Sequence, residues 1–263
     1  MVTLSLNDAV SRRRQPKPEV LTANAAWWDI LQALWYIREN GTKRILIAGP
    51  PGTGKSTTAQ RLLETNFRVT MTEGTAVEDL LGCFQLRKKK EEDKSAVTEW
   101  VDGPVPRAMK SGKGILVDEI DKMPPEIQSL AYAIMDDKPQ VMLPTGEMVD
   151  ASNGYGVVAT TNSNISVLPE ALIDRFDAVL VAVTPHEEAI DHLPSAEKAA
   201  VKNYYKSLSK DRWLWTGKST VRRMRSFHNL KISKLFPEKL AAHCVFGKSG
   251  DEIISVLATA AKG

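Results

Sequence analysis

Residues 49 to 56 read Gly-Pro-Pro-Gly-Thr-Gly-Lys-Ser, and this stretch decides the fold. It fits the pattern G-x-x-x-x-G-K-[ST], in which backbone N–H groups and a helix N-terminus surround phosphate groups. The preceding run, residues 44 to 48, is apolar and bounded by glycine and proline, as expected of a buried parallel strand. The order of strand, loop and helix is the context that this motif requires, and it predicts that the loop holds nucleotide phosphates.

The side chains of this loop have separate expected roles. Lys55 should reach the β and γ phosphates, and the hydroxyl group of Ser56 is placed to ligate Mg²⁺. Four fixed positions match by chance in roughly one sequence in a hundred, so the motif is specific. The residues expected to bind the nucleotide are Gly49, Pro50, Pro51, Gly52, Thr53, Gly54, Lys55, Ser56 and Thr57, of which Thr57 has no role of its own assigned.

Two carboxylates follow the apolar run at residues 114 to 117. Ligands of open parallel sheets bind at the carboxyl ends of the strands, so Asp118 is expected to face the Mg²⁺ ion. Glu119 should point in another direction and is the candidate to orient and deprotonate an attacking water. An acidic turn containing Asp121 would explain the pattern equally well by itself, and the glycine loop favours the catalytic interpretation.

A further apolar run, residues 155 to 160, leads to Thr161 and Asn162. Asn162 is expected to contact either the γ phosphate or the attacking water. Asparagine is also a common turn residue at strand ends, so this feature is weak when taken alone.

Strands alternate with helical segments along the first two thirds of the chain, which predicts a parallel sheet flanked by helices in an α/β fold of the P-loop NTPase type. After residue 184 the apolar runs of β type end, and a small all-helical lid domain is expected at the C-terminus. Further strands are expected at residues 68 to 71 and 178 to 183, and helices at residues 23 to 39, 195 to 209, 220 to 230, 237 to 246 and 251 to 260.

Two segments interrupt this alternation. Residues 82 to 102 contain the charged tract from Arg87 to Lys94, which indicates an exposed hairpin tip or loop, and residues 140 to 150 have the pattern of a hairpin around Pro-Thr-Gly. The expected division of the chain is a flexible N-terminal arm over residues 1–22, a nucleotide-binding domain over residues 23–184 and the lid over residues 185–263.

The composition is that of a globular protein, with 43% apolar and 25% charged residues and a net charge of +3 among 263 residues. This charge does not by itself indicate a nucleic-acid partner. The chain lacks an apolar run of the roughly 18 residues that a membrane span needs, and two distant cysteines suit a reducing compartment, so a cytoplasmic location is expected. The four histidines lack ligand spacing, so Mg²⁺ carried with the nucleotide is the metal expected.

The order of these motifs resembles that of AAA+ ATPases. The glycine loop, Asp118-Glu119, Thr-Thr-Asn162 and the segment Pro-Glu-Ala-Leu-Ile-Asp-Arg-Phe at residues 169 to 176 follow one another as they do in that family. Asp-Leu-Leu-Gly at 79 to 82, Asp-Gly-Pro at 102 to 104 and the two inserted segments resemble the MoxR-type branch of the helix-2-insert group. The resemblance spans about residues 40 to 260 and implies ATP and Mg²⁺ as cofactors.

The resemblance also assigns two arginines. Arg175 is the candidate arginine finger, which would reach the nucleotide of a neighbouring subunit, although a surface pair with Asp174 or Asp177 would explain it equally well without the family. Arg222 fits the position of the lid arginine, known as sensor 2, and Arg223 and Arg225 remain rivals. Trp27, Trp28 and Trp35 could stack on adenine, but core or subunit packing explains them better.

An arginine supplied in trans implies a homo-oligomeric ring, and the resemblance implies a hexamer. The leading hypothesis is an ATP-driven motor that remodels a client or adaptor protein, as MoxR-type proteins often do. A motor acting on nucleic acid is the second, with the arginines at 12 to 14 and the basic residues at 87 to 90 as phosphate contacts. A nucleotide-dependent switch that does not hydrolyse ATP is the third. No membrane partner is expected.

Overall fold

The computed structural model describes residues 25–37, 43–87, 97–207, 221–232, 237–246, 254–255 and 257–258. The N-terminal arm, most of the charged tract after Arg87 and the tryptophans at 213 and 215 lie outside the described residues.

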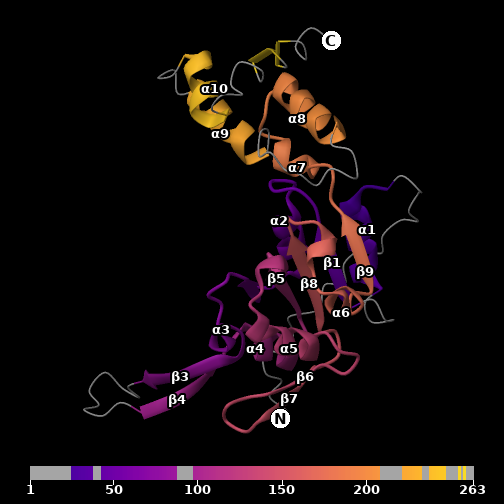
Figure 1. Ribbon diagram of the computed structural model, residues 1–263, viewed down its shortest axis with the longest axis vertical. Helices are drawn as coiled ribbons and strands as arrows, with labels where there is room; N and C mark the ends of the chain where they lie inside the picture. The colour runs from indigo at the N-terminus through magenta and orange to yellow at the C-terminus, as the bar shows by residue number, and fades with distance from the viewer. Residues whose placement is uncertain are drawn as a thin grey trace, which may run out of the picture.

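A five-stranded sheet in the order β2-β5-β8-β1-β9 forms the centre of the molecule, and all four pairings are parallel (Figure 1). The predicted α/β fold is confirmed, and each predicted strand is present within two residues of its expected bounds. The strands are β1 (Arg44–Ala48), β2 (Arg68–Thr70), β5 (Gly114–Asp118), β8 (Gly156–Thr161) and β9 (Ala178–Val181).

Both faces of this sheet are covered, and the alternation of side chains along the strands shows how. In β1, Ile45 and Ile47 pack on one side with α1 (Trp27–Tyr36) and α2 (Lys55–Leu63). Leu46 packs on the other side, which is covered by the helices that connect β2 with β8. These are α3 (Val77–Leu81), α4 (Pro104–Ser111) and α5 (Pro125–Ile134).

Helix α1 is fixed on the sheet by the ring of Trp35. A Cβ atom added to Gly114 would lie 2.6 Å from this ring, and one added to Gly156 would lie 2.9 Å from it. Glycine at the start of β5 and β8 therefore makes room for the tryptophan. Trp27 and Trp35 are buried in the core, as the packing interpretation of these residues predicted.

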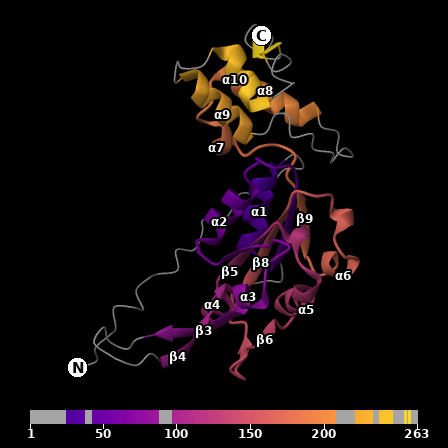
Figure 2. The ribbon, with the colours of Figure 1, turned by 60° about the vertical axis from the view of Figure 1, so that its left-hand side comes forward.

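Each of the two inserted segments contains an antiparallel hairpin. The first consists of β3 (Gly82–Arg87) and β4 (Val97–Asp102), and the second, which the sequence predicted, of β6 (Gln140–Met142) and β7 (Met148–Asp150). Gly82 and Gly103 form the neck of the first hairpin, where an added Cβ atom would lie 2.1 Å from Val101 O and 2.5 Å from Leu80 O respectively. Both hairpins lie at the end of the molecule away from the last helices (Figures 1 and 2).

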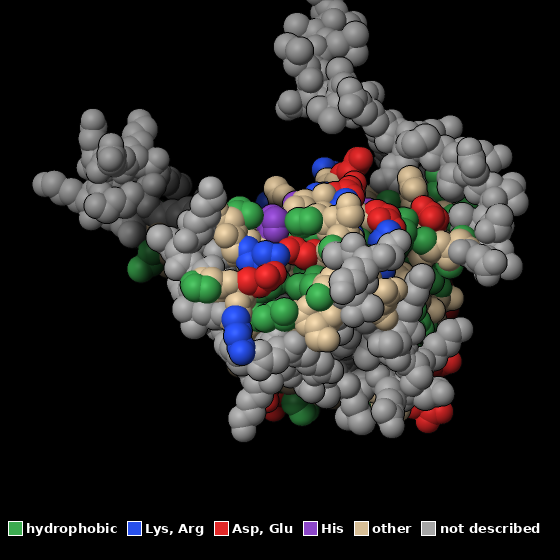
Figure 3. Space-filling model, turned by 90° about the horizontal axis from the view of Figure 1, so that it is seen from above, with side chains coloured by type: hydrophobic (Ala, Val, Ile, Leu, Met, Phe, Trp, Pro, Cys, Tyr) green, Lys and Arg blue, Asp and Glu red, His purple; other side chains and the backbone are tan. Residues whose placement is uncertain are grey.

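The helices after β9 have a hydrophobic core of their own, as expected of the lid. They are α7 (Glu187–Ile190), α8 (Ser195–Ser207), α9 (Val221–Ile232) and α10 (Glu238–Phe246), and their shared core includes Val201, Met224, Phe227, Ala241 and Leu257. Figure 2 shows them gathered beyond one end of the sheet. Seen from that end, acidic and basic side chains lie side by side on the described surface (Figure 3). Of the helix expected at residues 251 to 260, residues 254–255 and 257–258 are described and are helical.

Short elements complete the chain. A 3-10 turn at Ile120–Lys122 follows β5, and another at Ile165–Val167 follows β8 and precedes α6 (Glu170–Ile173). Asp177 then fixes the start of β9 beside β1. Its carboxylate accepts hydrogen bonds from the N–H groups of Lys43 and Arg44, both at 2.8 Å, and forms an ion pair with the Arg44 guanidinium at 2.6 Å.

Candidate functional site

The glycine loop connects the end of β1 with the start of α2 and is packed against the neighbouring strands. The N–H group of Gly49 donates to Thr161 O at 3.2 Å, and a Cβ atom added to Gly49 would lie 2.5 Å from Ala182 O. Gly54, which precedes the first turn of α2, has a φ of 93°, in the left-handed region that favours glycine. The glycines of the motif therefore permit both the close packing and the turn into the helix.

Lys55 lies almost completely buried below this loop. Its Nζ atom donates to Gly49 O at 2.8 Å, to Pro50 O at 2.7 Å and to Asn162 Oδ1 at 2.8 Å. Three acceptors match the three N–H donors of a protonated amine. Asn162 thus comes to Lys55 from the end of β8, and the structure brings together two residues that the sequence predicted for the phosphate site.

Burial lowers the pKa of Lys55 to about 7, and the carboxylates of Asp118, Asp121 and Glu119 act in the opposite direction. The physical cause is the loss of water around the charged amine. Added negative charge, such as that of phosphate groups, would favour the protonated form of this side chain.

Asp118 ends β5 and accepts hydrogen bonds from three sides. Ser56 Oγ donates to Asp118 Oδ1 at 2.6 Å, Thr160 Oγ1 donates to the same oxygen, and Arg68 Nη2 donates to Asp118 Oδ2. Asp118 as a whole residue is 5% exposed. Carboxylate and hydroxyl oxygens are the ligands that Mg²⁺ prefers, so the pair formed by Ser56 and Asp118 fits the ion that accompanies a nucleotide.

Glu119 takes a backbone conformation that few residues other than glycine adopt, with a φ of 55° and a ψ of 46°. Its N–H group donates to Thr160 Oγ1 at 3.3 Å, and its carboxylate forms an ion pair with Lys122 at 2.9 Å. The two neighbouring carboxylates therefore have different partners: Glu119 pairs with Lys122, and Asp118 contacts Ser56, Thr160 and Arg68.

Asp121 fixes the loop after β8 instead of facing the metal site. Its carboxylate accepts hydrogen bonds from Thr161 Oγ1 at 2.8 Å and from Ser163 Oγ at 2.7 Å. The acidic turn containing Asp121, which the sequence offered as an alternative, is therefore present. It holds the segment that carries Asn162.

Arg175 follows α6, and among the described residues its side chain contacts Tyr132 and Ala171 and none of the residues around Lys55. Its guanidinium lies over the ring of Tyr132, 4.4 Å from the ring centroid, and donates to Ala171 O at 2.7 Å. Asp177, which the sequence offered as a surface partner for Arg175, pairs with Arg44 instead. That alternative is therefore wrong for Asp177.

The three candidate lid arginines belong to the first turns of α9 (Val221–Ile232). The side chains of Arg222, Arg223 and Arg225 lie outside the described part of the structure. The choice of Arg222 stays a prediction.

The start of the lid, at α7 and the residue before it, contacts the glycine loop and α2. The N–H group of His186 donates to Thr53 O at 2.9 Å, and the His186 ring lies 4.8 Å from the ring of Trp28. Burial and the nearby charge of Arg61 lower the pKa of His186. Arg61 of α2 also forms an ion pair with Glu188 of α7. The first turn of the lid is therefore in direct contact with the nucleotide loop.

A match to a protein-family model covers residues 44–176, from the first residue of β1 to the phenylalanine after Arg175. The family is the AAA domain, dynein-related subfamily. The chain belongs to this family. The glycine loop lies inside the matched residues, and the sheet order, the buried lysine and the carboxylates at the end of β5 fit an ATP-binding domain of the P-loop type.

Relatives of this AAA domain protein occur in staphylococci. Uncharacterized proteins of Staphylococcus saprophyticus and of Staphylococcus aureus strain USA300 are each 35% identical over 147 residues, covering 53% of this chain and 55% of the relative. The chain thus spans about half the length of the curated relatives that it matches. NtrX from Brucella abortus, solved in complex with ATP, aligns with a TM-score of 0.48 and 16% identity over 94% of this chain and 70% of that chain.

Two residues of this AAA domain contact the site without having been predicted from the sequence. Arg68 reaches Asp118 from β2, and Thr160 supports both Asp118 and Glu119. Thr160 belongs to the Thr-Thr-Asn motif and could have been found from it. Arg68 could not, because its proximity depends on the pairing of β2 with β5, in which Thr70 lies opposite Asp118.

Within the described residues, no group of three or more histidine, cysteine, aspartate or glutamate side chains is placed to hold a metal ion. Over the same residues, the structure contains no helix with the length and apolar character needed to cross a membrane.

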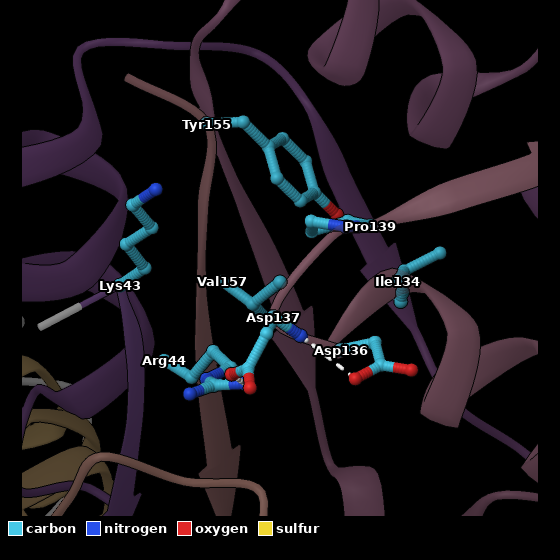
Figure 4. Close-up of a pocket in the computed structure, with 8 residues that line it drawn as sticks. All are labelled: Lys43, Arg44, Ile134, Asp136, Asp137, Pro139, Tyr155 and Val157. Atoms are coloured by element: carbon cyan, nitrogen blue, oxygen red, sulfur yellow. Dashed lines mark hydrogen bonds and ion pairs between the residues drawn. The ribbon is translucent and has the colours of Figure 1, made fainter. Parts of the chain in front are cut away.

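A small pocket of about 200 Å³ lies beside the start of β1, whereas the glycine loop follows the end of that strand. Figure 4 shows the residues that line it. Lys43 and Arg44 line it from the start of β1, and Asp136 and Asp137 from the end of α5. Among the described residues, the buried hydroxyl group of Tyr155 at this pocket has no hydrogen-bond partner, and burial raises the pKa of this hydroxyl. The pocket is separate from the candidate active site.

Proposed function

We propose that this chain hydrolyses ATP with Mg²⁺, with Glu119 as the residue that activates the attacking water and Lys55 and Asn162 as phosphate contacts. One observation carries the proposal. The hydrogen bonds from Lys55 to Asn162 and from Ser56 to Asp118 unite three distant segments at the carboxyl edge of the sheet. Phosphoryl transfer depends on positioning and charge more than on covalent chemistry, and this edge supplies both.

Ser56 and Asp118 are the proposed Mg²⁺ ligands, together with the phosphate oxygens of the nucleotide. The ion would neutralise charge on the phosphates as the bond to the leaving group breaks. Thr160 holds Asp118 in place and accepts the N–H group of Glu119, so one threonine positions both carboxylates.

The proposed active unit is a homo-oligomeric ring, a hexamer in the MoxR-type branch, in which Arg175 acts on the nucleotide of the neighbouring subunit. Asp177, two residues after Arg175, pairs with Arg44 at the start of β1, whereas the ATP-binding loop follows the end of β1. Five residues of strand separate these points by about 16 Å. Arg175 therefore lies near the far end of the sheet from its own nucleotide loop, which supports a role in trans.

We further propose that the ring remodels a client or adaptor protein in the cytoplasm, as the MoxR-type resemblance implies. The domain division proposed is residues 23–184 and 185–263, and the separate hydrophobic core of the helices after residue 185 supports it. Two hairpins at the end away from the lid expose Phe84, Leu86, Met142 and Met148, with 56%, 75%, 56% and 46% of each residue accessible. These exposed apolar side chains on the hairpin strands support a protein client over a nucleic acid.

The test is the variant Glu119→Gln in the assembled protein. It should lower the rate of ATP hydrolysis by about two to four orders of magnitude, because a general base contributes that much, while ATP still binds. A pull-down with the variant and ATP should retain the client. Unchanged hydrolysis in Glu119→Gln would refute the assignment of the base.

The assembled wild-type protein distinguishes this proposal from its two alternatives, a motor acting on nucleic acid and a nucleotide-dependent switch. ATP hydrolysis stimulated by DNA, with a steep dependence on salt concentration, would identify a nucleic-acid motor. Absence of hydrolysis in the concentrated, assembled wild-type protein would identify a nucleotide-dependent switch and would refute the ATPase proposal.

A further inference from the structure

Arg68 contacts the carboxylate that is proposed to bind Mg²⁺, although it belongs to none of the motifs of the site. It is the first residue of β2, which runs beside β5. Its Nη2 atom donates to Asp118 Oδ2, and its Nη1 atom donates to Gln60 Oε1 at 3.4 Å. The guanidinium therefore lies between the edge of the sheet and helix α2.

The two oxygens of Asp118 are used differently. Oδ1 accepts from the hydroxyl groups of Ser56 and Thr160, which are neutral donors. Oδ2 receives the only charged donor among the described contacts of Asp118, which is Arg68. A buried carboxylate is unfavourable without a counter-charge, and the guanidinium of Arg68 supplies one.

A divalent cation at Asp118 would lie beside the guanidinium of Arg68. Two like charges bound to one carboxylate repel each other, and the repulsion is stronger in a site with little water. The side chain of Arg68 is 39% exposed whereas that of Asp118 is 8% exposed. Arg68 can therefore turn toward solvent and Gln60 without any rearrangement of the core.

We propose that Arg68 is a positioning residue that competes with Mg²⁺ for Asp118. The inference rests on the proposed role of Asp118 as a Mg²⁺ ligand. Arg68 holds the carboxylate in place until the ion arrives with the nucleotide, and it then gives up Oδ2. The contact raises the Mg²⁺ concentration that nucleotide binding requires, so it sets a threshold for loading the site.

The experiment measures the binding of a fluorescent ADP analogue as the MgCl₂ concentration is raised. Arg68→Gln should reach half-maximal binding at a Mg²⁺ concentration about three- to tenfold below that of the wild-type protein, the range expected when one partly exposed ion pair no longer competes. Arg107→Gln is the matched control, because it removes a positive charge from an arginine that contacts the ring of Phe67. Its Mg²⁺ requirement should equal that of the wild-type protein.

A second readout does not depend on nucleotide turnover. In EDTA, Arg68→Gln should melt at a lower temperature than the wild-type protein, because Asp118 has lost its counter-charge, and MgCl₂ with ADP should remove most of this difference. Arg68→Lys keeps a positive charge without the planar fork and should show a smaller shift in its Mg²⁺ requirement. It also provides a test if Arg68→Gln fails to fold.

Two results would overturn the inference. An unchanged or higher Mg²⁺ requirement in Arg68→Gln would show that Arg68 does not compete with the ion. If Arg68→Gln weakened nucleotide binding equally with and without Mg²⁺, Arg68 would be shown to contact phosphate instead. Asp118→Asn distinguishes these results from a failure of the proposed function: if that variant keeps the wild-type Mg²⁺ dependence, the assignment of Asp118 is wrong and the inference about Arg68 fails with it.

Discussion

Lys55 shows how the environment of a single residue sets its chemistry. Burial lowers its pKa to about 7, so the amine loses its proton near neutral pH. In the unfolded chain the lysine keeps its proton up to a pH of about 10.4. Between these two values the unfolded state binds more protons than the folded state, so this residue makes the free energy of unfolding rise with pH from about 7 to about 10.4. At lower pH the folded protein retains a buried charge, which is unfavourable.

This pKa predicts that nucleotide binding takes up a proton in alkaline solution. Bound phosphates favour the charged amine, so binding of Mg²⁺ and ADP at pH 8.5 should be accompanied by uptake of up to one proton, and the affinity should fall by at most about tenfold for each pH unit above 7. Calorimetry in two buffers with different ionisation enthalpies measures the uptake. Binding without uptake at pH 8.5 would show that Lys55 is already protonated there.

The lid contains a carboxylate, that of Glu197, which is buried between helices and pairs with basic side chains. Glu197 of α8 is 3% exposed and lies 3.3 Å from His228 Nδ1 and 3.3 Å from Lys231 Nζ, both on α9. Lys231 in turn forms an ion pair with Glu238 of α10 at 3.0 Å. Burial acts to lower the pKa of Lys231, but its two carboxylate partners outweigh this effect and raise it. Glu197 therefore connects α8 with α9, and Lys231 extends the network to α10.

Removing that carboxylate should destabilise the protein strongly. Glu197→Ala removes one of the two carboxylate partners of Lys231 and the carboxylate beside His228, and we expect the free energy of unfolding to fall by about 2 kcal/mol. The matched control is Glu187→Ala, since Glu187 pairs with Lys202 at the surface, where more than 40% of both side chains is exposed. This control should change stability by less than about 1 kcal/mol. Urea unfolding followed by circular dichroism measures both values, and equal effects would contradict the importance of burial.

At the scale of the whole molecule, each subunit is proposed to hold an active site that lacks an arginine until a neighbouring subunit supplies it. Arg175 contacts Tyr132 and Ala171 within the chain, at the end of the sheet away from its own ATP-binding loop. A mobile positive charge on the transition-state phosphates would then have to come from another subunit. This arrangement would make hydrolysis depend on assembly.

Mixing two inactive variants tests the arrangement. Arg175→Ala should lower ATP turnover by about a thousandfold or more, because an arginine finger contributes that much. A mixture with Glu119→Gln should recover activity that neither variant shows alone, since a Glu119→Gln subunit can supply Arg175 to a neighbour with an intact base. Failure of the mixture to recover activity, although the subunits exchange, would indicate a role within the same chain.

The glycine loop, the α/β class and the candidates Asp118, Glu119 and Asn162 could be predicted from the sequence, because they depend on short stretches of backbone with a fixed local geometry. Strand β1 has the bounds that its apolar run predicted. Which distant residues meet could not be predicted in this way and follows from the tertiary structure. Lys55 contacts a residue 107 positions away and Asp118 one 50 positions away. Those contacts follow from the order β2-β5-β8-β1-β9, in which neighbours in the sheet are not neighbours in the sequence.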